Sequence, residues 1–321
     1  MTTALVKDEL VEVEDFLAAE PGEKSQIKNF HVVLIALYNP NSFPVHILGS
    51  LLRSKGFKVS YVSFKVNVTN GMAMPTKKEY DMLMKLVADL KPDLIGLTLM
   101  SAFAQVAKDL TKKMRSLGVP IAWGGAHAVD SSDDSIEHAD IVCVGEGEIP
   151  LLKLAYALSR GEDYKDIKSL WFNDNGVIVK NELFPLIQNL DLLPFPQFED
   201  DDKYFIDNNE LSLGETYYKD SLSWYNVMTG RGCPYLCTFC SNSFLNEKFK
   251  DLGSILRRRT VDNVIEELVI AKDRFPKLSR ISANDEVFVL EKNWLREFAD
   301  KYQKHVGISF HCDLYPTRVT E

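Results

Sequence analysis

Short apolar segments alternate with amphipathic segments over residues 31–159, and this alternation limits the fold more than any other feature of the sequence. The predicted strands cover 31–38, 57–64, 94–99, 120–123 and 140–144. The predicted helices cover 45–55, 77–90, 102–117 and 149–159, where apolar side chains repeat at helical spacing. Strands that alternate with helices predict an α/β fold with a doubly wound parallel sheet, because each helix carries the chain back across the sheet.

A second alternation begins near Ser223. Its predicted strands are 223–229, 279–284 and 308–312, and helices are expected up to about residue 274 and around 294–302. Before it, 168–180 predicts a hairpin, and the prolines and acids of 185–202 predict a linker. The sequence thus predicts four regions: an acidic N-terminal arm (1–29), an α/β domain (30–160), a hairpin and linker (161–222) and a second domain (223–321).

Composition excludes several classes of protein. The 321 residues are 45% hydrophobic and 26% charged, which rules out wholesale disorder. The longest apolar stretch, 32–38, is too short to span a bilayer, and the acidic N-terminus lacks the basic flank of a signal peptide. A net charge of −9 argues against general nucleic-acid binding. We therefore expect a cytoplasmic protein with neither a membrane nor a nucleic acid as partner.

Ligands of doubly wound sheets bind beyond the carboxyl ends of the strands. In this sequence those ends meet the loops 39–44, 100–103, 123–127 and 145–148. Glycines in the last two loops would let the backbone approach a bulky ligand closely. The same glycines are equally explained by tight turns, because glycine is common where strands turn into helices.

Three of the five cysteines fall within eight residues, as Cys233-x-x-x-Cys237-x-x-Cys240. Thiolates at this spacing can converge on one metal centre. The fourth position is filled either by a distant residue or by a substrate or cofactor. Structural zinc is disfavoured, because no second pair of ligands accompanies the three. Cys143 and Cys312 are expected to be packed thiols.

The cysteine motif and its flanks resemble the cobalamin-binding radical S-adenosylmethionine (SAM) family. The match includes the aromatic Phe239 before the last cysteine and extends from about residue 31 to the C-terminus. Further matching segments are Arg231-Gly232, Ser241-Asn242, 257–260, 263–264, 284–288, 190–196, 39–44, 123–127 and 145–148. The resemblance implies a cobalamin-binding-like first domain with a flavodoxin-like strand order, followed by a radical SAM (βα) partial barrel.

The resemblance also implies cofactors and their residues. Cys233, Cys237 and Cys240 would each bind one iron of a [4Fe–4S] cluster, whose fourth iron would take SAM. Phe239, Asp285 and Glu286 would lie against SAM; the alternative for either acid is a helix N-cap. If cobalamin binds, its expected wall includes Ser101, Gly124, Gly125, Glu146 and Gly147. Arg257–Arg259 are interpreted as a solvated face rather than an anion site.

Two features depart from the family pattern. The first domain lacks the Asp-x-His-x-x-Gly motif by which some cobalamin domains supply a histidine ligand, and neither His46 nor His127 is expected to replace it. The second departure is length. Six βα units need about 180 residues, whereas 223–321 has room for about three strands. The sequence therefore predicts an incomplete barrel, as in a truncated chain or a portion of a longer enzyme.

The first hypothesis for function is a radical SAM enzyme that cleaves SAM reductively, with flavodoxin or ferredoxin as electron donor, and methylates an unreactive carbon of an unknown organic substrate through cobalamin. One alternative is a radical SAM cyclase or rearrangement enzyme without functional cobalamin. Another is a non-catalytic fragment or cluster-binding module of a longer enzyme. The sequence names neither the substrate nor the oligomeric state.

Overall fold

The structure is a computed structural model that describes residues 4–19, 27, 29–65, 73–196, 202–214, 223–288 and 291–315. The chain divides into two compact units, which are considered separately. The nine-stranded unit comprises Ala19–Phe184 and Pro194–Tyr217; the cysteine unit comprises Met1–Ala18, Pro185–Leu193 and Tyr218–Glu321. The domain boundaries at residues 29, 160 and 222 stay predictions. No helix of the described residues has the length and hydropathy needed to cross a membrane.

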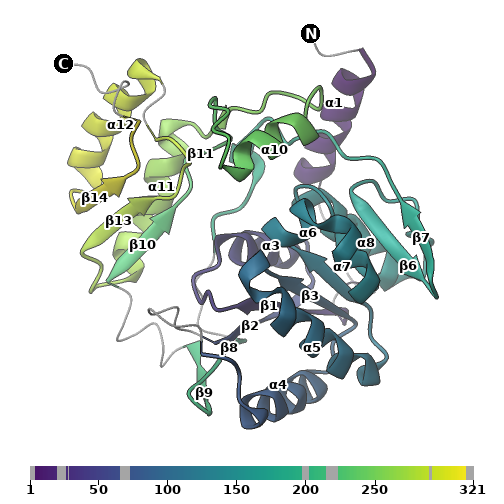
Figure 1. Ribbon diagram of the computed structural model, residues 1–321. Helices are drawn as coiled ribbons and strands as arrows, with labels where there is room; N and C mark the ends of the chain where they lie inside the picture. Colours follow the sequence, from purple (N-terminus) through teal and green to yellow (C-terminus); the bar gives the residue numbers. More distant parts are fainter. Residues whose placement is uncertain are drawn as a thin grey trace. The chain divides into compact units, whose positions relative to one another are not determined.

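Five parallel strands form the centre of the nine-stranded sheet (Figure 1). They are β1 (His31–Leu37), β2 (Lys58–Phe64), β3 (Leu94–Thr98), β4 (Ile121–Gly124) and β5 (Ile141–Cys143). Their order across the sheet is β2-β1-β3-β4-β5, which confirms the expected flavodoxin-like arrangement. Every residue of β1 is buried, as expected for a central strand covered on both faces.

A hairpin extends each edge of this sheet. On one side, β6 (Leu170–Asp174) and β7 (Val177–Lys180) add to β5, which confirms the hairpin predicted over 168–180. On the other side, β8 (Lys203–Asp207) pairs with β2 and turns into β9 (Glu210–Leu213). The sequence analysis missed this second hairpin. Its signal was Asn208-Asn209, since both residues have positive φ and suit a two-residue turn.

Helices cover both faces of the sheet. α3 (Phe43–Ser54) contacts α8 (Glu148–Arg160), whereas α4 (Lys77–Leu90) contacts α5 (Ala104–Met114). The short helices α6 (Ala126–Asp130) and α7 (Ser132–His138) follow β4, and α7 packs on α5. Turns of 3₁₀ helix, Ser101–Phe103 and Arg115–Leu117, flank α5. The main core lies between the sheet and the α4, α5 and α7 layer, and includes the fully buried Trp123.

A smaller parallel sheet organises the cysteine unit. Its strands are β10 (Trp224–Val227), β13 (Arg280–Ala283) and β14 (Ser309–Cys312), in the order β10-β13-β14. The helices α11 (Val261–Arg274) and α12 (Lys292–His305) follow the first two strands, as predicted. The described part of this unit also holds α1 (Ala4–Ala18), α10 (Ser241–Lys248), the 3₁₀ turn Leu190–Leu192 and a two-stranded ribbon of β11 (Gly230–Arg231) and β12 (Arg257–Arg258).

Both long helices of this unit cover the same face of its sheet. Tyr225 on β10 donates a hydrogen bond to Glu267 on α11 (2.7 Å), and Phe310 on β14 packs against Phe298 and Tyr302 of α12. Tyr225 and Phe310 lie in register across β13, so their side chains share one face. The packing fixes the strands whose carboxyl ends carry the cysteine loop and Asp285.

Candidate functional site

The three cysteines lie in the loop that joins β11 to α10. Cys233 is buried, whereas Cys237 and Cys240 are half-buried. The carbonyl of Cys237 accepts bonds from the amide of Cys240 (3.0 Å) and from the hydroxyl of Ser243 (2.6 Å), and Asn246 donates its side-chain amide to the carbonyl of Cys233 (3.0 Å). Residues in the first turns of α10 therefore hold the loop by hydrogen bonds to its backbone, and none of these bonds involves a thiol.

The thiols themselves are not gathered into a ligand set. Throughout the described ranges, no three His, Cys, Asp or Glu side chains come close enough together to hold a metal ion. The donor chemistry nevertheless fits an iron–sulfur cluster, because such clusters are held by cysteine thiolates and one short loop supplies three of them. The roles of Cys233, Cys237 and Cys240 stay predictions.

Asp285 follows β13 and is only 4% exposed. Its two oxygens accept hydrogen bonds from the amide of Thr229 (2.7 Å) and from the hydroxyl of the same residue, and the amide of Gly230 also donates to it. Burial raises the pKa of Asp285, although these bonds and the nearby Arg258 guanidinium oppose the shift. The N-cap alternative for this residue is wrong, because α12 is capped by Glu291.

The prediction of a solvated face at Arg257–Arg259 is wrong. Arg259 is buried, forms an ion pair with Glu267, and donates to the carbonyl of Met228 (3.1 Å). Arg258 stacks on Trp294 and lies 3.8 Å from a carboxylate oxygen of Asp285. The prediction failed because three consecutive arginines resemble a surface patch, whereas the acids that pair with them lie elsewhere in the chain.

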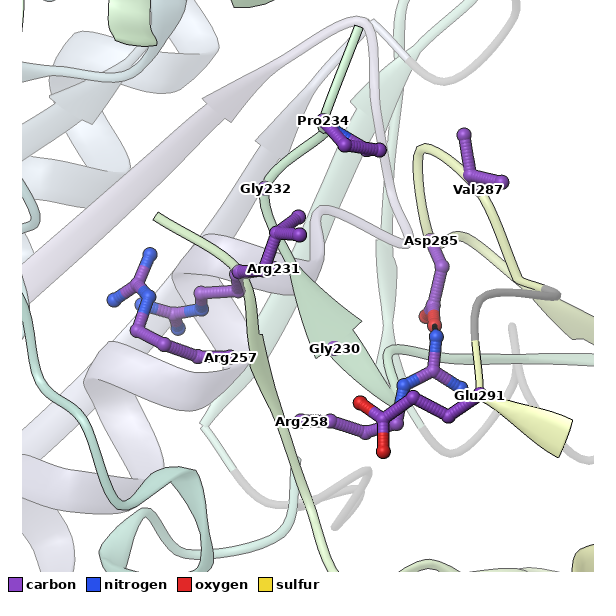
Figure 2. Close-up of a pocket in the computed structure, with 10 residues that line it drawn as sticks. Gly230, Arg231, Gly232, Pro234, Arg257, Arg258, Asp285, Val287 and Glu291 are labelled. Carbon is purple, nitrogen blue, oxygen red and sulfur yellow. Dashed lines mark ion pairs between the residues drawn. The ribbon is translucent and has the colours of Figure 1, made fainter. Parts of the chain in front are cut away.

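A pocket of about 190 Å³ lies where these elements meet (Figure 2). Gly230, Gly232 and Pro234 from the start of the cysteine loop line it together with Asp285 and Val287, which follow β13. Figure 2 shows Arg258 reaching toward Asp285. Sequence reasoning named Gly232 only as a flank of the cysteine motif and missed Thr229 and Gly230, although a Gly-x-Gly directly before a cysteine motif is a visible signal of backbone close approach.

The two glycines are required by the ribbon. A Cβ at Gly230 would lie 2.8 Å from the carbonyl oxygen of Arg257, and one at Gly232 would lie 2.2 Å from that of Ile255. Gly232 also has a φ of +91°, in the left-handed region that favours glycine. The chain therefore enters Cys233 along a path that admits no side chain at either position.

The other predicted SAM residues lie open to solvent. Phe239 is 91% exposed, and Glu286 is exposed beside the buried Asp285. A large aromatic side chain with so much exposed surface is a candidate for contact with a ligand. Their contacts with SAM stay predictions.

The predicted cobalamin residues cluster at the carboxyl edge of the nine-stranded sheet. Ser101 opens the 3₁₀ turn after β3, Gly124 ends β4, and Gly147 precedes α8. The half-buried Glu146 lies next to Gly147, and Cys143 at the end of β5 is half-buried rather than a core thiol. Three neighbouring strands thus bring these residues to one edge, where the sequence analysis placed them.

The fold requires glycine at one position of this edge but not at two others. Gly125 has a φ of +91°, and a Cβ there would lie 2.7 Å from the hydroxyl of Thr98, so the fold itself requires glycine. A Cβ at Gly124 would lie 3.9 Å from the Cβ of Cys143, and one at Gly147 would lie 3.4 Å from a methyl carbon of Leu48, both ordinary van der Waals distances. The tight-turn explanation therefore holds for Gly125, whereas the fold does not itself require glycine at Gly124 or Gly147.

The histidines near this edge serve the protein itself. His127 is buried; its amide donates to the carbonyl of Leu99 (3.2 Å), and its Nδ1 lies 3.1 Å from the hydroxyl of Ser101. His46 is buried against Tyr61, and burial lowers its pKa to about 3, which keeps the ring neutral. The expectation that neither ring is a cobalamin ligand stays a prediction.

Comparisons with known proteins match the first part to a family model and the chain more widely to several relatives. Residues 32–155 match the family model of the B12 binding domain. An uncharacterized methyltransferase of Pyrococcus horikoshii, PH0819, is 30% identical over 213 residues, which are 65% of this chain and 42% of that protein. The anaerobic magnesium-protoporphyrin IX monomethyl ester cyclase of Cereibacter sphaeroides is 28% identical over 180 residues, 53% of this chain and 27% of that one. The chain therefore spans less than half the length of either relative.

A solved structure shows the same fold. The radical SAM methyltransferase TsrM of Kitasatospora setae, determined with cobalamin and a [4Fe–4S] cluster, superposes with a TM-score of 0.65 at 19% identity and covers 86% of this chain and 53% of its own. The predicted α/β fold is confirmed, with a doubly wound sheet in the segment that matches the B12 binding domain and parallel βα units after it. Residues 32–155 match the B12 binding domain, and the chain resembles the cobalamin-binding radical SAM proteins, as its cysteine motif predicted.

Proposed function

We propose that this chain belongs to a radical SAM enzyme that cleaves SAM reductively and uses cobalamin to methylate an unreactive carbon of an organic substrate. One observation carries the proposal: the three-cysteine loop follows the carboxyl end of the first strand of a parallel βα sheet, where α/β folds hold their active sites. The activity, the substrate and the electron donor, for which flavodoxin and ferredoxin are the candidates, are part of the proposal.

The chain's own residues have separate tasks in this scheme. Cys233, Cys237 and Cys240 would hold a [4Fe–4S] cluster, which supplies one electron to the sulfonium of SAM when bound. Phe239 would offer the adenine an exposed aromatic surface, and the Glu286 carboxylate would pair with the SAM ammonium.

In the nine-stranded unit, Ser101, Gly124, Gly125, Glu146 and Gly147 would form the wall against cobalamin. The fit rests on the meeting of three strand ends at one carboxyl edge and on Gly124 and Gly147, two glycines that the fold does not itself require. The buried, bonded His46 and His127 offer no axial ligand, so we expect the chain to hold cobalamin without a histidine from this edge.

We expect Gly124→Val to weaken cobalamin binding about tenfold or more, because the new side chain would occupy space at the edge that a ligand must otherwise fill. The melting temperature should change little, since strands favour β-branched residues and a Cβ at Gly124 makes only an ordinary contact with Cys143 (3.9 Å). Cobalamin retained after gel filtration, read from its visible spectrum, measures the effect. Gly125→Ala is the matched control and should lower the melting temperature. If wild type and Gly124→Val retain equal amounts of cobalamin, the assigned wall is wrong.

Anaerobic reconstitution with iron, sulfide and cobalamin tests the whole proposal. The loaded protein, supplied with a reductant and SAM, should form 5′-deoxyadenosine and methionine, and iron, sulfide and cobalt should be bound in defined ratios. A protein that binds iron but forms no 5′-deoxyadenosine would support the alternative of a cluster-binding module. No retention of iron would overturn the proposal.

The similarity to the cyclase of Cereibacter sphaeroides favours a second candidate, a radical SAM cyclase or rearrangement enzyme. The two candidates share the cysteine loop and differ in the use of cobalamin. SAM with a labelled methyl group separates them, because only methyl transfer places the label in the product. Defined cobalt binding with a labelled product favours the methyltransferase; SAM cleavage that needs no cobalt favours the cyclase.

A further inference from the structure

Between β10 and Cys233, each of the three consecutive residues 228–230 forms a hydrogen bond to a side chain from another segment of the protein. The carbonyl of Met228 accepts from the Arg259 side chain (3.1 Å), and the carbonyl of Thr229 accepts from the Arg259 amide (2.9 Å). The amides of Thr229 and Gly230 and the hydroxyl of Thr229 all donate to Asp285. Thr229 is fully buried, so these donors have no access to water as a substitute partner.

We propose that Asp285 is a positioning residue, which fixes Thr229 and Gly230 and thereby the point at which Cys233 enters the cluster site; this rests on the proposed function. Asp285 acts through the backbone, since both of its oxygens are engaged by Thr229. The exposed neighbour Glu286 is left to contact SAM.

Arg258 completes the device. It lies 3.8 Å from Asp285, stacks on Trp294, and donates to the carbonyl of Phe288 (2.8 Å). Arg258 also belongs to β12, where it pairs with Gly230, one of the two residues that Asp285 holds. The carboxylate thus links β13, the ribbon and the end of β10 at the entrance to the cysteine loop, and its charge stays paired inside the protein.

Removing the Asp285 carboxylate leaves the amides of Thr229 and Gly230 and the hydroxyl of Thr229 buried without a partner. We expect Asp285→Ala to speed iron release from the reconstituted protein to a chelator about tenfold or more, the usual effect of losing hydrogen bonds to a charged group. Thr229→Val, which deletes only the hydroxyl, should give a smaller increase, and Thr229→Ser should restore the wild-type rate.

The matched control is Tyr302→Phe, which removes a hydrogen bond to the carbonyl of Ile308 (2.9 Å) in the same unit but away from the cysteine loop. Iron release is compared at a temperature at which far-UV circular dichroism shows every apo variant folded. Faster release from Asp285→Ala and Thr229→Val than from Tyr302→Phe supports the positioning role.

Two results would overturn the inference, and they are distinguishable. If wild type retains iron and Asp285→Ala and Thr229→Val release it no faster than Tyr302→Phe, the positioning role is wrong while the proposed function stands. If wild type itself retains no iron, the proposed function fails and the inference with it. Should Asp285→Ala not fold, Thr229→Val against Thr229→Ser decides, because a valine that releases iron at the serine rate would exclude a role for the hydroxyl bond.

Discussion

Reconstituted Cys237→Ala protein is expected to lose SAM cleavage by more than about 100-fold and to retain less iron, since changes that only touch a ligand's neighbours already cost about 10–100-fold in metal affinity. The loop should keep its shape. The bonds that Cys240 and Ser243 make to residue 237 go to its backbone carbonyl, which alanine retains. The variant therefore removes a thiol and little else. 5′-Deoxyadenosine formed per chain, with iron and sulfide quantified in the same sample, measures the loss.

Cys312→Ala is the control for that experiment. Cys312 ends β14 in the same unit, is half-buried like Cys237, and burial raises the pKa of its thiol. A thiol held in its neutral form is a poor cluster ligand, so this variant should cleave SAM like wild type. Intact cleavage by Cys237→Ala would show the cluster assignment to be wrong, and loss of iron from Cys312→Ala would make that cysteine the fourth protein ligand.

Local sequence signals predicted the framework of the protein well. The helix predicted over 77–90 has the bounds Lys77–Leu90 in the structure, because Thr76 and Glu79 form a capping box at its start and Pro92 follows its end. The three predicted strands of the cysteine unit lie within a few residues of β10, β13 and β14. In each case the information is carried by residues close to one another in the chain.

What the sequence analysis missed depends on distant pairs. The burial of Arg259 rests on Glu267 and on the carbonyl of Met228, which is 31 residues away. The bond between Asp285 and Thr229 spans 56 residues. Sequence periodicity gives no information about such pairs. The three arginines alone therefore suggest a solvated face, and Asp285 alone suggests a helix N-cap or a contact with SAM. The functional motif itself was readable because Cys233, Cys237 and Cys240 lie in one short loop.

A mutation in a buried ion cluster of the nine-stranded unit is expected to cause the second large effect, a loss of stability. Lys65, directly after β2, is 4% exposed and places its ammonium 2.7 Å from Glu79 and 2.6 Å from Asp207. Glu79 is fully buried and also accepts from the amides of Thr76 (2.7 Å) and Asn209 (3.2 Å). Lys65 therefore ties the start of α4 to the β8–β9 hairpin, an element that the sequence analysis did not foresee.

The cluster also sets how stability depends on pH. Burial favours the neutral acid, but the bonds from Lys65, Thr76 and Asn209 outweigh it and lower the pKa of Glu79 from its ordinary 4.5. Burial likewise disfavours the Lys65 cation, but its two carboxylate partners raise the pKa above the ordinary 10.5. Stability from Glu79 is thus complete above pH 4.5 and lost as the pH falls through its lower folded pKa. Stability from Lys65 is complete below pH 10.5 and lost as the pH rises through its higher one.

We expect Lys65→Met to lower the free energy of unfolding by about 3–5 kcal/mol at pH 7, because it strands the Glu79 charge in the interior. Adding Glu79→Gln should recover part of the loss, since the amide oxygen can still accept from Thr76 and only the half-buried Asp207 carboxylate is left without Lys65. Urea unfolding followed by circular dichroism measures both variants. Lys165→Met, which breaks the exposed pair with Asp174, is the control and should leave the midpoint unchanged. A Lys65→Met midpoint equal to that of the control would mean that solvent reaches Glu79 and that the cluster does not hold the hairpin.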